Sequence, residues 1–317
     1  MEKPADILTP QLTADGSFTF FSKEFRETYH SHSGARQEAE RKFVEPCQLV
    51  KKAQNLIRTP NQGQTPPKLR LLDICYGLGY NSAAALANIW TVNPNCQVES
   101  IALESNPSVP RQAIAHQLLA QWQLPIPQLL EQLGTTCQVQ REQLQAQLLI
   151  GDARQTIQQV YRSGFQADAI FLDPFSPPKC PQLWTVEFLV LVAQCLKPTG
   201  RIATYSCAAS VRTALRLAGL AVGASTSVGR RSPGTVASFT PDGLPPLSQQ
   251  EQEHLQTRAA IPYRDPQLCD PAELILQRRQ IEQQVSPLEP SSHWKKRWSV
   301  AAIDAKRSVL LSDTGRA

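Results

Sequence analysis

Polar side chains that could bind a ligand and take up a proton follow four apolar runs of this sequence. The first run, residues 71–75, leads into YGLGYN at 76–81. Its glycines would let the backbone turn sharply and approach a ligand, and the small residues that follow predict a helix whose first N–H groups are free to bind it. Ser82 stands where the third glycine of a dinucleotide-binding loop would fall, so the ligand has to be identified from the other runs.

Acidic residues end the second and third runs, at Glu104 and Asp152. Glu104 could accept hydrogen bonds from a ribose diol, or it could be a solvated carboxylate at a strand end. Asp152, followed by the small Ala153, could accept from an adenine amino group, or it could only cap the helix that begins there, since Asp is a preferred N-cap residue. A Gly loop, an acid and a second acid at successive strand ends form the layout of S-adenosylmethionine enzymes.

Asp173 ends the fourth run and precedes a proline-rich segment, PFSPPKCPQLW at 174–184. Prolines stiffen the backbone, so Asp173 and Phe175 would stand on a rigid platform that faces the cofactor. An amine that accepts a methyl group must direct its lone pair at the methyl carbon and then lose a proton, and Asp173 could serve both needs; alternatively, it only bonds local backbone N–H groups. Alignment can supply roughly 7–11 kcal/mol of such a barrier, and desolvation favours the neutral, reactive amine.

Alternating strands and helices are expected to bring these four ends together. Strands are predicted at 69–75, 98–103, 147–150, 168–173, 200–205 and 221–227, and helices near 81–90, 108–120, 153–162, 184–196 and 208–218. This order predicts an α/β, Rossmann-like fold with a mostly parallel sheet, in which ligands bind at the carboxyl ends of the strands. The Gln- and Leu-rich segment 117–147 is expected to add a helix pair or one extended helix.

We expect three parts in the chain. Residues 1–67 would be an N-terminal extension with an aromatic cluster at 18–21, a helix from 35 to about 56 and a linker at 62–67. Residues 68–240 would form the Rossmann-like domain. Residues 241–317 would be a C-terminal extension with a helix at 271–284 and a loose tail beyond about 304.

Composition indicates a soluble cytoplasmic protein. The net charge of +5 permits an anionic partner without being strongly polybasic. No apolar run approaches the roughly 18 residues that span a bilayer, and the N-terminus lacks the apolar core of a secretory signal. The eight cysteines form no C-x-x-C pair, so we expect reduced, buried thiols rather than disulfides or a metal site.

Several segments resemble the methyltransferase domain of the bifunctional tRNA 5-methylaminomethyl-2-thiouridine biosynthesis enzymes. The resemblance covers about 13–240 and is carried by 13–45, LDICYGLGYN at 72–81, GDA at 151–153, LDPFSPPKCPQLWT at 172–185, 204–222 and GRR at 229–231. Pro174 stands where that family usually has glycine. No flavin-dependent oxidase segment follows, so the chain looks like a stand-alone module.

The resemblance implies methyl transfer from S-adenosyl-L-methionine to the amine of 5-aminomethyl-(2-thio)uridine at tRNA wobble position 34, without metal or FAD. The residues that it places around the cofactor are Tyr76, Gly77, Gly79, Asn81, Glu104, Asp152, Ala153 and Asp173. Asp173 would also be the catalytic residue and would meet the target base together with Phe175. Tyr29 and His30 would fold over the site, although His30 could instead be a plain surface residue.

For the tRNA anticodon loop, the predicted topology adds basic residues near one sheet edge, namely Lys179, Arg212, Arg216, Arg230 and Arg231. The tail offers the run 294–298 (WKKRW), and Trp184 is a candidate for stacking on a base or for the core. The basic residues could equally be solvated faces.

Three alternatives remain. The D-P-x-x-P loop at 173–177 also occurs in aminopropyltransferases of the spermidine synthase type, but their G-G-G-D-G loop is absent here. A DNA amino-methylase would need a second proline after Pro174. A non-catalytic Rossmann-like module that binds RNA or a partner is disfavoured because all four strand-end groups are present.

Overall fold

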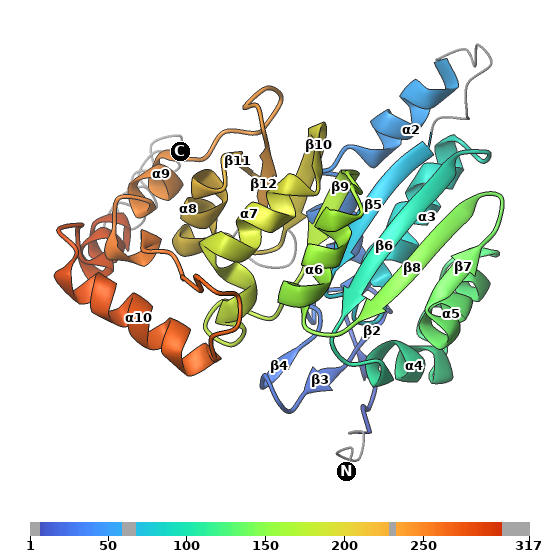
Figure 1. Cartoon of the computed structure of the whole chain (residues 1–317), viewed down its shortest axis with the longest axis horizontal. Coiled ribbons are helices and arrows are strands. Elements are labelled where there is room, and N and C mark those ends of the chain that lie inside the picture. The colour runs from blue at the N-terminus through green and yellow to red at the C-terminus, as the bar shows by residue number, and fades with distance from the viewer. Residues whose placement is uncertain (1–6, 59–67, 228–232, 300–317) are drawn as a thin grey trace, which may run out of the picture.

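The computed structural model describes residues 7–58, 68–227 and 233–299. At its centre is an eight-stranded sheet in the order β11-β12-β10-β9-β5-β6-β8-β7, with helices on both faces (Figure 1). The strands are β5 (Lys68–Ile74), β6 (Gln97–Glu104), β7 (Gln138–Gln140), β8 (Leu144–Ile150), β9 (Ala167–Leu172), β10 (Leu196–Thr204), β11 (Ala221–Ala224) and β12 (Thr235–Ser238). The α/β, Rossmann-like fold expected from the sequence is confirmed.

Strand direction and register place the four polar ends at one edge of the sheet. Strands β8, β6, β5, β9 and β10 are parallel, whereas β12 and β7 run antiparallel to their neighbours. Ile74 pairs with Leu103 on one side and Leu172 on the other, so β5, β6 and β9 end level with one another. The strand order reverses between β5 and β9, which is the point where open α/β sheets bind ligands.

Helices cover the two faces of the sheet in separate layers. One layer contains α3 (Tyr80–Val92), α4 (Ser108–Ala115) and α5 (Ile126–Thr136), and the other contains α6 (Ala153–Arg162), α7 (Val186–Gln194) and α8 (Ala209–Leu217). In Figure 1, α6 and α7 lie in front of the sheet and α3 lies behind it. Residues 71–74 on β5 are buried from both sides, which explains why they are apolar apart from Asp73.

The helical prediction for segment 117–147 is wrong in part. The structure has one helix there, α5, followed by β7 and most of β8. Val139, Leu144, Ala146 and Leu148 are buried whereas the residues between them are more exposed, and this alternation with period two is typical of strands.

The N-terminal part forms two short hairpins and a broken helix. Strand β1 (Gln11–Leu12) pairs with β2 (Phe18–Thr19), and β3 (Phe21–Ser22) pairs with β4 (Glu27–Thr28). The helix predicted over 35–56 consists of α1 (Ala35–Glu38), the π-helical η1 (Ala39–Val44) and α2 (Leu49–Arg58). Pro46 falls in the interruption, where its missing N–H cannot continue a helix.

The C-terminal part packs on the α7 and α8 side, at the opposite end of the sheet from β7 (Figure 1). It contains α9 (Gln249–His254), the short 3-10 helix η3 (Arg258–Ala260), α10 (Ala272–Val285) and an α-helical segment at 291–299. The predicted linker at 62–67 and the tail beyond 304 lie outside the described residues. No helix in the described part of the chain is long and apolar enough to cross a membrane.

All eight cysteines fall within the described residues and none forms a disulfide there. Cys47, Cys96, Cys180 and Cys195 are buried, and Cys269 is the exposed one. Burial, expected for all eight, therefore holds for four of them, while three are partly exposed.

Candidate active site

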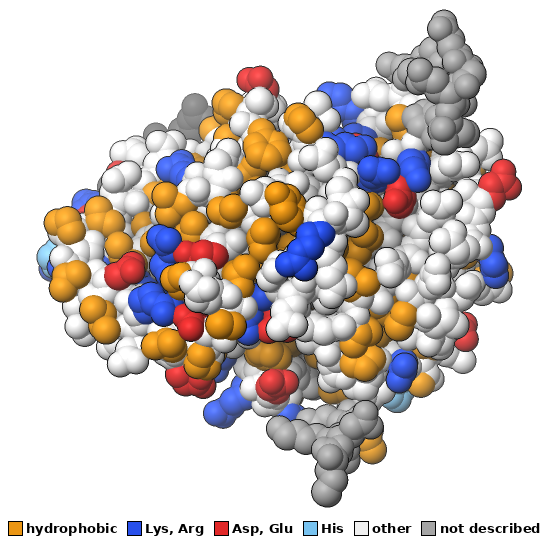
Figure 2. All heavy atoms as spheres, in the orientation of Figure 1, with side chains coloured by type: hydrophobic (Ala, Val, Ile, Leu, Met, Phe, Trp, Pro, Cys, Tyr) orange, Lys and Arg blue, Asp and Glu red, His pale blue; other side chains and the backbone are white. Residues whose placement is uncertain are grey.

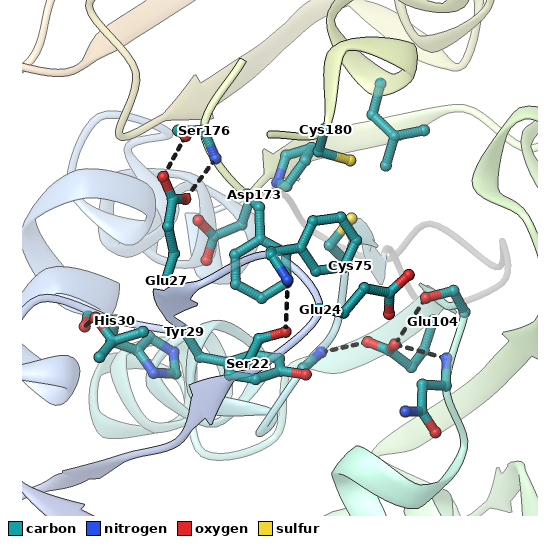
Figure 3. A pocket seen from close by; sticks show the side chains of 18 of the residues that line it. Ser22, Glu24, Glu27, Tyr29, His30, Cys75, Glu104, Asp173, Ser176 and Cys180 are labelled. Atoms are coloured by element: carbon teal, nitrogen blue, oxygen red, sulfur yellow. Dashed lines mark hydrogen bonds between the residues drawn. The ribbon is translucent and has the colours of Figure 1, made fainter. Parts of the chain in front are cut away.

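A cavity of about 630 Å³ opens at the carboxyl ends of the central strands, beneath the β3–β4 hairpin (Figure 3). This volume lies within the range of small-molecule sites. Eight of the residues singled out from the sequence line it: Tyr29, His30, Gly77, Glu104, Asp152, Ala153, Asp173 and Phe175. These eight of the predicted residues therefore lie together around one cavity.

The glycine loop presents bare backbone to the cavity. Gly77 has φ +56° and Gly79 has φ +84°, a region that side chains rarely adopt. A Cβ on Gly79 would lie 2.6 Å from the Tyr76 hydroxyl oxygen, so that position has no room for one. Tyr76, Gly79 and Asn81 stand behind the cavity wall, where they shape the loop, and only Gly77 of the loop's glycines reaches the cavity.

Glu104 ties the end of β6 to the glycine loop. Its Oε2 accepts a hydrogen bond from the Gly77 N–H at 2.8 Å, and its Oε1 accepts one from the Asn106 N–H at 2.9 Å (Figure 3). Burial raises the pKa of Glu104 above its usual value, against the opposing effect of these N–H groups. The residue is 7 % exposed, so the alternative of a solvated strand-end carboxylate is wrong.

Asp152 is both a helix cap and a cavity residue. Its Oδ1 accepts from the Arg154 N–H at 2.9 Å at the start of α6, which confirms the N-cap alternative. The same carboxylate is paired with the Arg154 guanidinium. Burial acts to raise the pKa of Asp152, but the Arg154 hydrogen bonds and charge outweigh it and leave the pKa lowered. Its contact with an adenine amino group stays a prediction.

Asp173 follows β9, and its N–H donates to the Ile74 carbonyl at 3.1 Å, which anchors it beside β5. Its Oδ2 accepts from the Asn81 side-chain amide at 2.9 Å. Burial raises the pKa of Asp173 well above its usual value, and the charges of Glu38 and Asp73 act in the same direction, whereas the Asn81 bond opposes them. A carboxyl group of this kind binds a proton more readily than an exposed aspartate.

The β3–β4 hairpin closes the cavity over the segment after Asp173. The Glu27 carboxylate accepts from the Ser176 N–H at 3.0 Å and from the Ser176 hydroxyl (Figure 3). Phe25 stacks on Phe175 with ring centroids 4.3 Å apart, and Tyr29 meets Phe175 edge-on at 5.0 Å. Three aromatic rings therefore gather beside the Asp173 platform.

On the other side of the Asp173 platform, one hydroxyl group and one indole N–H donate hydrogen bonds to its backbone. Tyr205 donates to the Pro174 carbonyl at 2.9 Å, and the Trp184 indole N–H donates to the Phe175 carbonyl at 2.8 Å. Trp184 is fully buried, so its use as a stacking surface for RNA is wrong and its core role is confirmed.

His30 is buried rather than exposed, which excludes the surface alternative. Its ring meets Tyr80 edge-on at 5.0 Å and its Nδ1 lies 3.4 Å from the Thr19 hydroxyl oxygen. Burial lowers the pKa of His30 to about 3, so the imidazole is neutral at physiological pH. His30 can therefore shape the wall but does not supply a positive charge.

The basic residues predicted to contact RNA differ in their exposure. Lys179 and Arg216 are exposed, whereas Arg230 and Arg231 lie outside the described residues. Arg212 is wrong as an RNA contact, because it is 2 % exposed and donates to Glu251 at 2.7 Å. In the tail, Arg297 is paired with Glu289 at 2.6 Å.

Figure 2 shows a gathering of Lys and Arg side chains over the starts of the central strands, away from the cavity. Lys68 and Arg70 pair there with Glu99, and Lys197 pairs with Asp168. These cations therefore have acidic partners at the edge opposite the site.

Sequence reasoning missed Phe25, Glu27 and Ser176. The aromatic cluster at 18–21 points to the N-terminal segment, but the contacts with the Asp173 platform come from Phe25 in the tip of the next hairpin and from Glu27 in β4. Strands of two residues carry no periodic signal, and the Glu27–Ser176 contact spans 149 positions.

Comparisons with known proteins agree with this architecture. A family model described as S-adenosyl-L-methionine-dependent methyltransferase matches residues 110–240. The crystal structure of MnmC2 from Aquifex aeolicus is 34 % identical, covers 89 % of this chain and 86 % of its own, and superposes with a TM-score of 0.74.

Two curated relatives are more distant. An uncharacterized protein of Methanocaldococcus jannaschii is 27 % identical over 84 % of this chain and 70 % of its own. The tRNA 5-methylaminomethyl-2-thiouridine biosynthesis bifunctional protein MnmC of Polaromonas naphthalenivorans is 31 % identical over 66 % of this chain and 32 % of its own. This chain thus spans about a third of the length of the bifunctional relatives that it matches.

Proposed function

The chain belongs to the MnmC methyltransferase family, and from that membership we propose that it methylates 5-aminomethyl-(2-thio)uridine at the wobble position of the tRNA anticodon loop. The product would be 5-methylaminomethyl-(2-thio)uridine. The observation that carries the proposal is the Asp173 carboxyl group, whose pKa is raised and which lies at the switch point of the sheet between the glycine loop and an aromatic cluster. Amine methylation needs a proton acceptor between the cofactor and the target base.

The residues of the cavity fit S-adenosyl-L-methionine, which supplies an electrophilic methyl group on a sulfonium when it is bound. Gly77 leaves a stretch of wall without a side chain, and a Cβ there would already reach within 3.5 Å of the Tyr29 ring. Glu104 retains lone pairs for a diol beyond its two N–H bonds. We propose that Gly77, Glu104, Asp152 and Ala153 hold the cofactor, with Tyr76, Gly79 and Asn81 supporting the wall.

The charge of the cavity also favours cationic ligands. Among the described residues its wall carries six carboxyl groups and two basic side chains, namely Glu24, Glu27, Glu38, Glu104, Asp152 and Asp173 against Lys23 and Arg26. A cleft lined by one sign of charge concentrates ligands of the opposite sign. A sulfonium and a primary ammonium are both such ligands.

Asp173 would orient the substrate amine and remove its proton. The Asn81 amide holds one carboxylate oxygen at 2.9 Å, so the group has a fixed direction. Asn81 is 3 % exposed and does not line the cavity, so it supports Asp173 from behind the wall and leaves the other carboxylate oxygen for the amine. A positioned general base contributes typically 10²–10⁴-fold to a rate.

The aromatic cluster provides a surface for the target base. Phe25, Tyr29 and Phe175 line the cavity, and Phe175 is two residues from Asp173. RNA-binding proteins commonly stack splayed loop bases on such rings. Lys179 is exposed at the end of the same platform, and we propose that it contacts a phosphate of the loop.

The test is transfer of labelled methyl from S-adenosyl-L-methionine to tRNA that carries aminomethyluridine at the wobble position. We expect the label in 5-methylaminomethyluridine after nucleoside digestion and mass spectrometry, and none with tRNA that lacks the aminomethyl group. Absence of transfer to the aminomethylated tRNA would refute the proposal. Use of decarboxylated S-adenosylmethionine to alkylate a free polyamine would replace it with the aminopropyltransferase alternative.

A further inference from the structure

Arg154 connects the C-terminal part of the chain to the wall of the cavity. From the first turn of α6, its Nε donates to Oδ1 and Oδ2 of Asp152 at 3.2 and 3.1 Å, and its Nη2 donates to Oδ2 at 2.7 Å. Its Nη1 donates to Asp265 Oδ2 at 2.8 Å and to the Asp270 carbonyl at 2.9 Å. We call this set of contacts the Arg154 bridge.

Asp265, at the end of the bridge away from the cavity, is held by several hydrogen bonds. Asp265 is fully buried, and its second oxygen accepts from the N–H groups of Cys269 and Asp270, each at 3.1 Å. Its own N–H donates to Glu187 at 2.8 Å. Asp265 therefore has its position set by its own loop and by α7 before Arg154 is added.

The same segment also meets the chain that leaves the Asp173 platform. The Val186 N–H donates to the Tyr263 carbonyl at 3.1 Å, just after the short 3-10 helix η2 (Pro181–Trp184). Cys180 lines the cavity, and burial raises the pKa of its thiol, while the nearby charges of Asp152 and Arg154 act on this pKa in opposite directions. Residues 263–270 thus adjoin two walls of the cavity, although none of them lines it.

We propose that Arg154 and Asp265 are positioning residues for the cofactor, and that residues 263–270 set its affinity by holding Asp152 in one orientation. This inference rests on the proposed cofactor site and gives the C-terminal part a role in it. A guanidinium fork that bonds both carboxylate oxygens fixes rotation as well as charge. Without the fork, ligand binding itself must order Asp152, which should weaken binding about two- to tenfold.

Reciprocity supplies a test that a purely structural role would not pass. If residues 263–270 favour cofactor binding, then a ligand in the cavity must stabilise residues 263–270 by the same factor. We expect S-adenosylhomocysteine to slow hydrogen exchange of these amides in the wild-type protein. In Arg154→Gln, the ligand should protect the glycine loop but no longer residues 263–270.

Calorimetry with S-adenosylhomocysteine gives the affinities. We expect Kd to rise two- to tenfold in Arg154→Gln and Asp265→Asn, and less in Arg154→Lys, since an ammonium keeps the charge but not the fork. Arg297→Gln removes an exposed ion pair of the same C-terminal part and should leave Kd unchanged. If Asp265→Asn fails to fold, the two Arg154 variants carry the test.

Two results would overturn the inference. One is an unchanged Kd for S-adenosylhomocysteine in Arg154→Gln. The other is a hydrogen-exchange rate of residues 263–270 that the ligand does not change in the wild-type protein. Both measurements omit tRNA. A protein that binds S-adenosylhomocysteine with the expected coupling but does not methylate tRNA would refute the proposed substrate and keep the bridge, whereas no binding at all would refute the cofactor site and the bridge together.

Discussion

Replacing Asp173 by asparagine preserves the size of the side chain and removes its charge. The Asn81 amide can still donate to an oxygen at 2.9 Å, so the wall of the cavity keeps its shape. What is lost is the proton acceptor, and general-base contributions of 10²–10⁴-fold correspond to about 3–5 kcal/mol of barrier. We therefore expect kcat with aminomethylated tRNA to fall by that factor, while Kd for S-adenosylhomocysteine changes little.

The pH dependence follows from the raised pKa of Asp173, which burial causes first and the charge of Glu38 second. The folded protein holds this proton more tightly than the unfolded chain, so the contribution to stability is present at low pH and is lost as pH rises through the folded-state pKa. Asp173→Asn removes the cost of a buried charge, so the variant should be more stable than the wild type above that pKa. Activity of the wild type should rise over the same pH range.

Single-turnover methylation and thermal unfolding, each measured across pH, separate the two effects. The expected pattern is a variant that is slower by at least a hundredfold and has an equal or higher Tm at alkaline pH. Ser176→Ala, which removes the hydroxyl bonded to Glu27 but no titrating group, is the matched control for the platform. Turnover of Asp173→Asn within threefold of the wild type would refute the assigned role of this carboxylate.

Three further outcomes follow from the same structure. Gly79→Ala should lower Tm, because φ is +84° and a Cβ would lie 2.6 Å from the Tyr76 hydroxyl; an unchanged Tm would mean that the loop has other conformations. Phe25→Ala should raise KM for tRNA about five- to a hundredfold without affecting S-adenosylhomocysteine binding, since stacking on one ring contributes roughly 1–3 kcal/mol per base; Phe18→Ala is the control, and an equal effect there would argue against a base contact. Asp73 has its pKa raised to about 7 by burial, so stability of the wild type should decline from pH 4 to pH 8 by up to roughly 4 kcal/mol, and denaturant titration of Asp73→Asn should show a flatter curve.

The central sheet could be predicted because burial leaves a strong mark on a parallel strand. The run at 71–74 is apolar on both faces apart from Asp73, and its level pairing with β6 and β9 follows once the strands are parallel and adjacent. The convergence of Glu104, Asp152 and Asp173 on one cavity was predictable for the same reason. It needs only the ends of the strands, which are the positions that periodicity locates best.

Contacts made by side chains across long sequence separations could not be predicted in this way. Arginine is usually found at the protein surface, yet the guanidinium of Arg212 is buried and donates to Glu251, 39 positions away. The pattern that distinguishes a solvated arginine from a buried, paired one lies in the partner and not in the arginine. The same holds for Arg154, which no sequence pattern distinguishes from other residues at helix starts and which donates to Asp265 across 111 positions.

The β3–β4 hairpin and residues 263–270 therefore adjoin the same cavity, but on different walls. The β3–β4 hairpin contacts the Asp173 platform through Glu27 and Phe25, on the side where we place the base. Residues 263–270 reach Asp152 through Arg154, on the side where we place the adenine. Because the two sets of contacts share no side chain, changes in the hairpin should alter KM for tRNA and changes in the bridge should alter cofactor affinity. A Rossmann-like core without these two segments would keep the strand ends that line the cavity and lose the contacts that we propose orient its ligands.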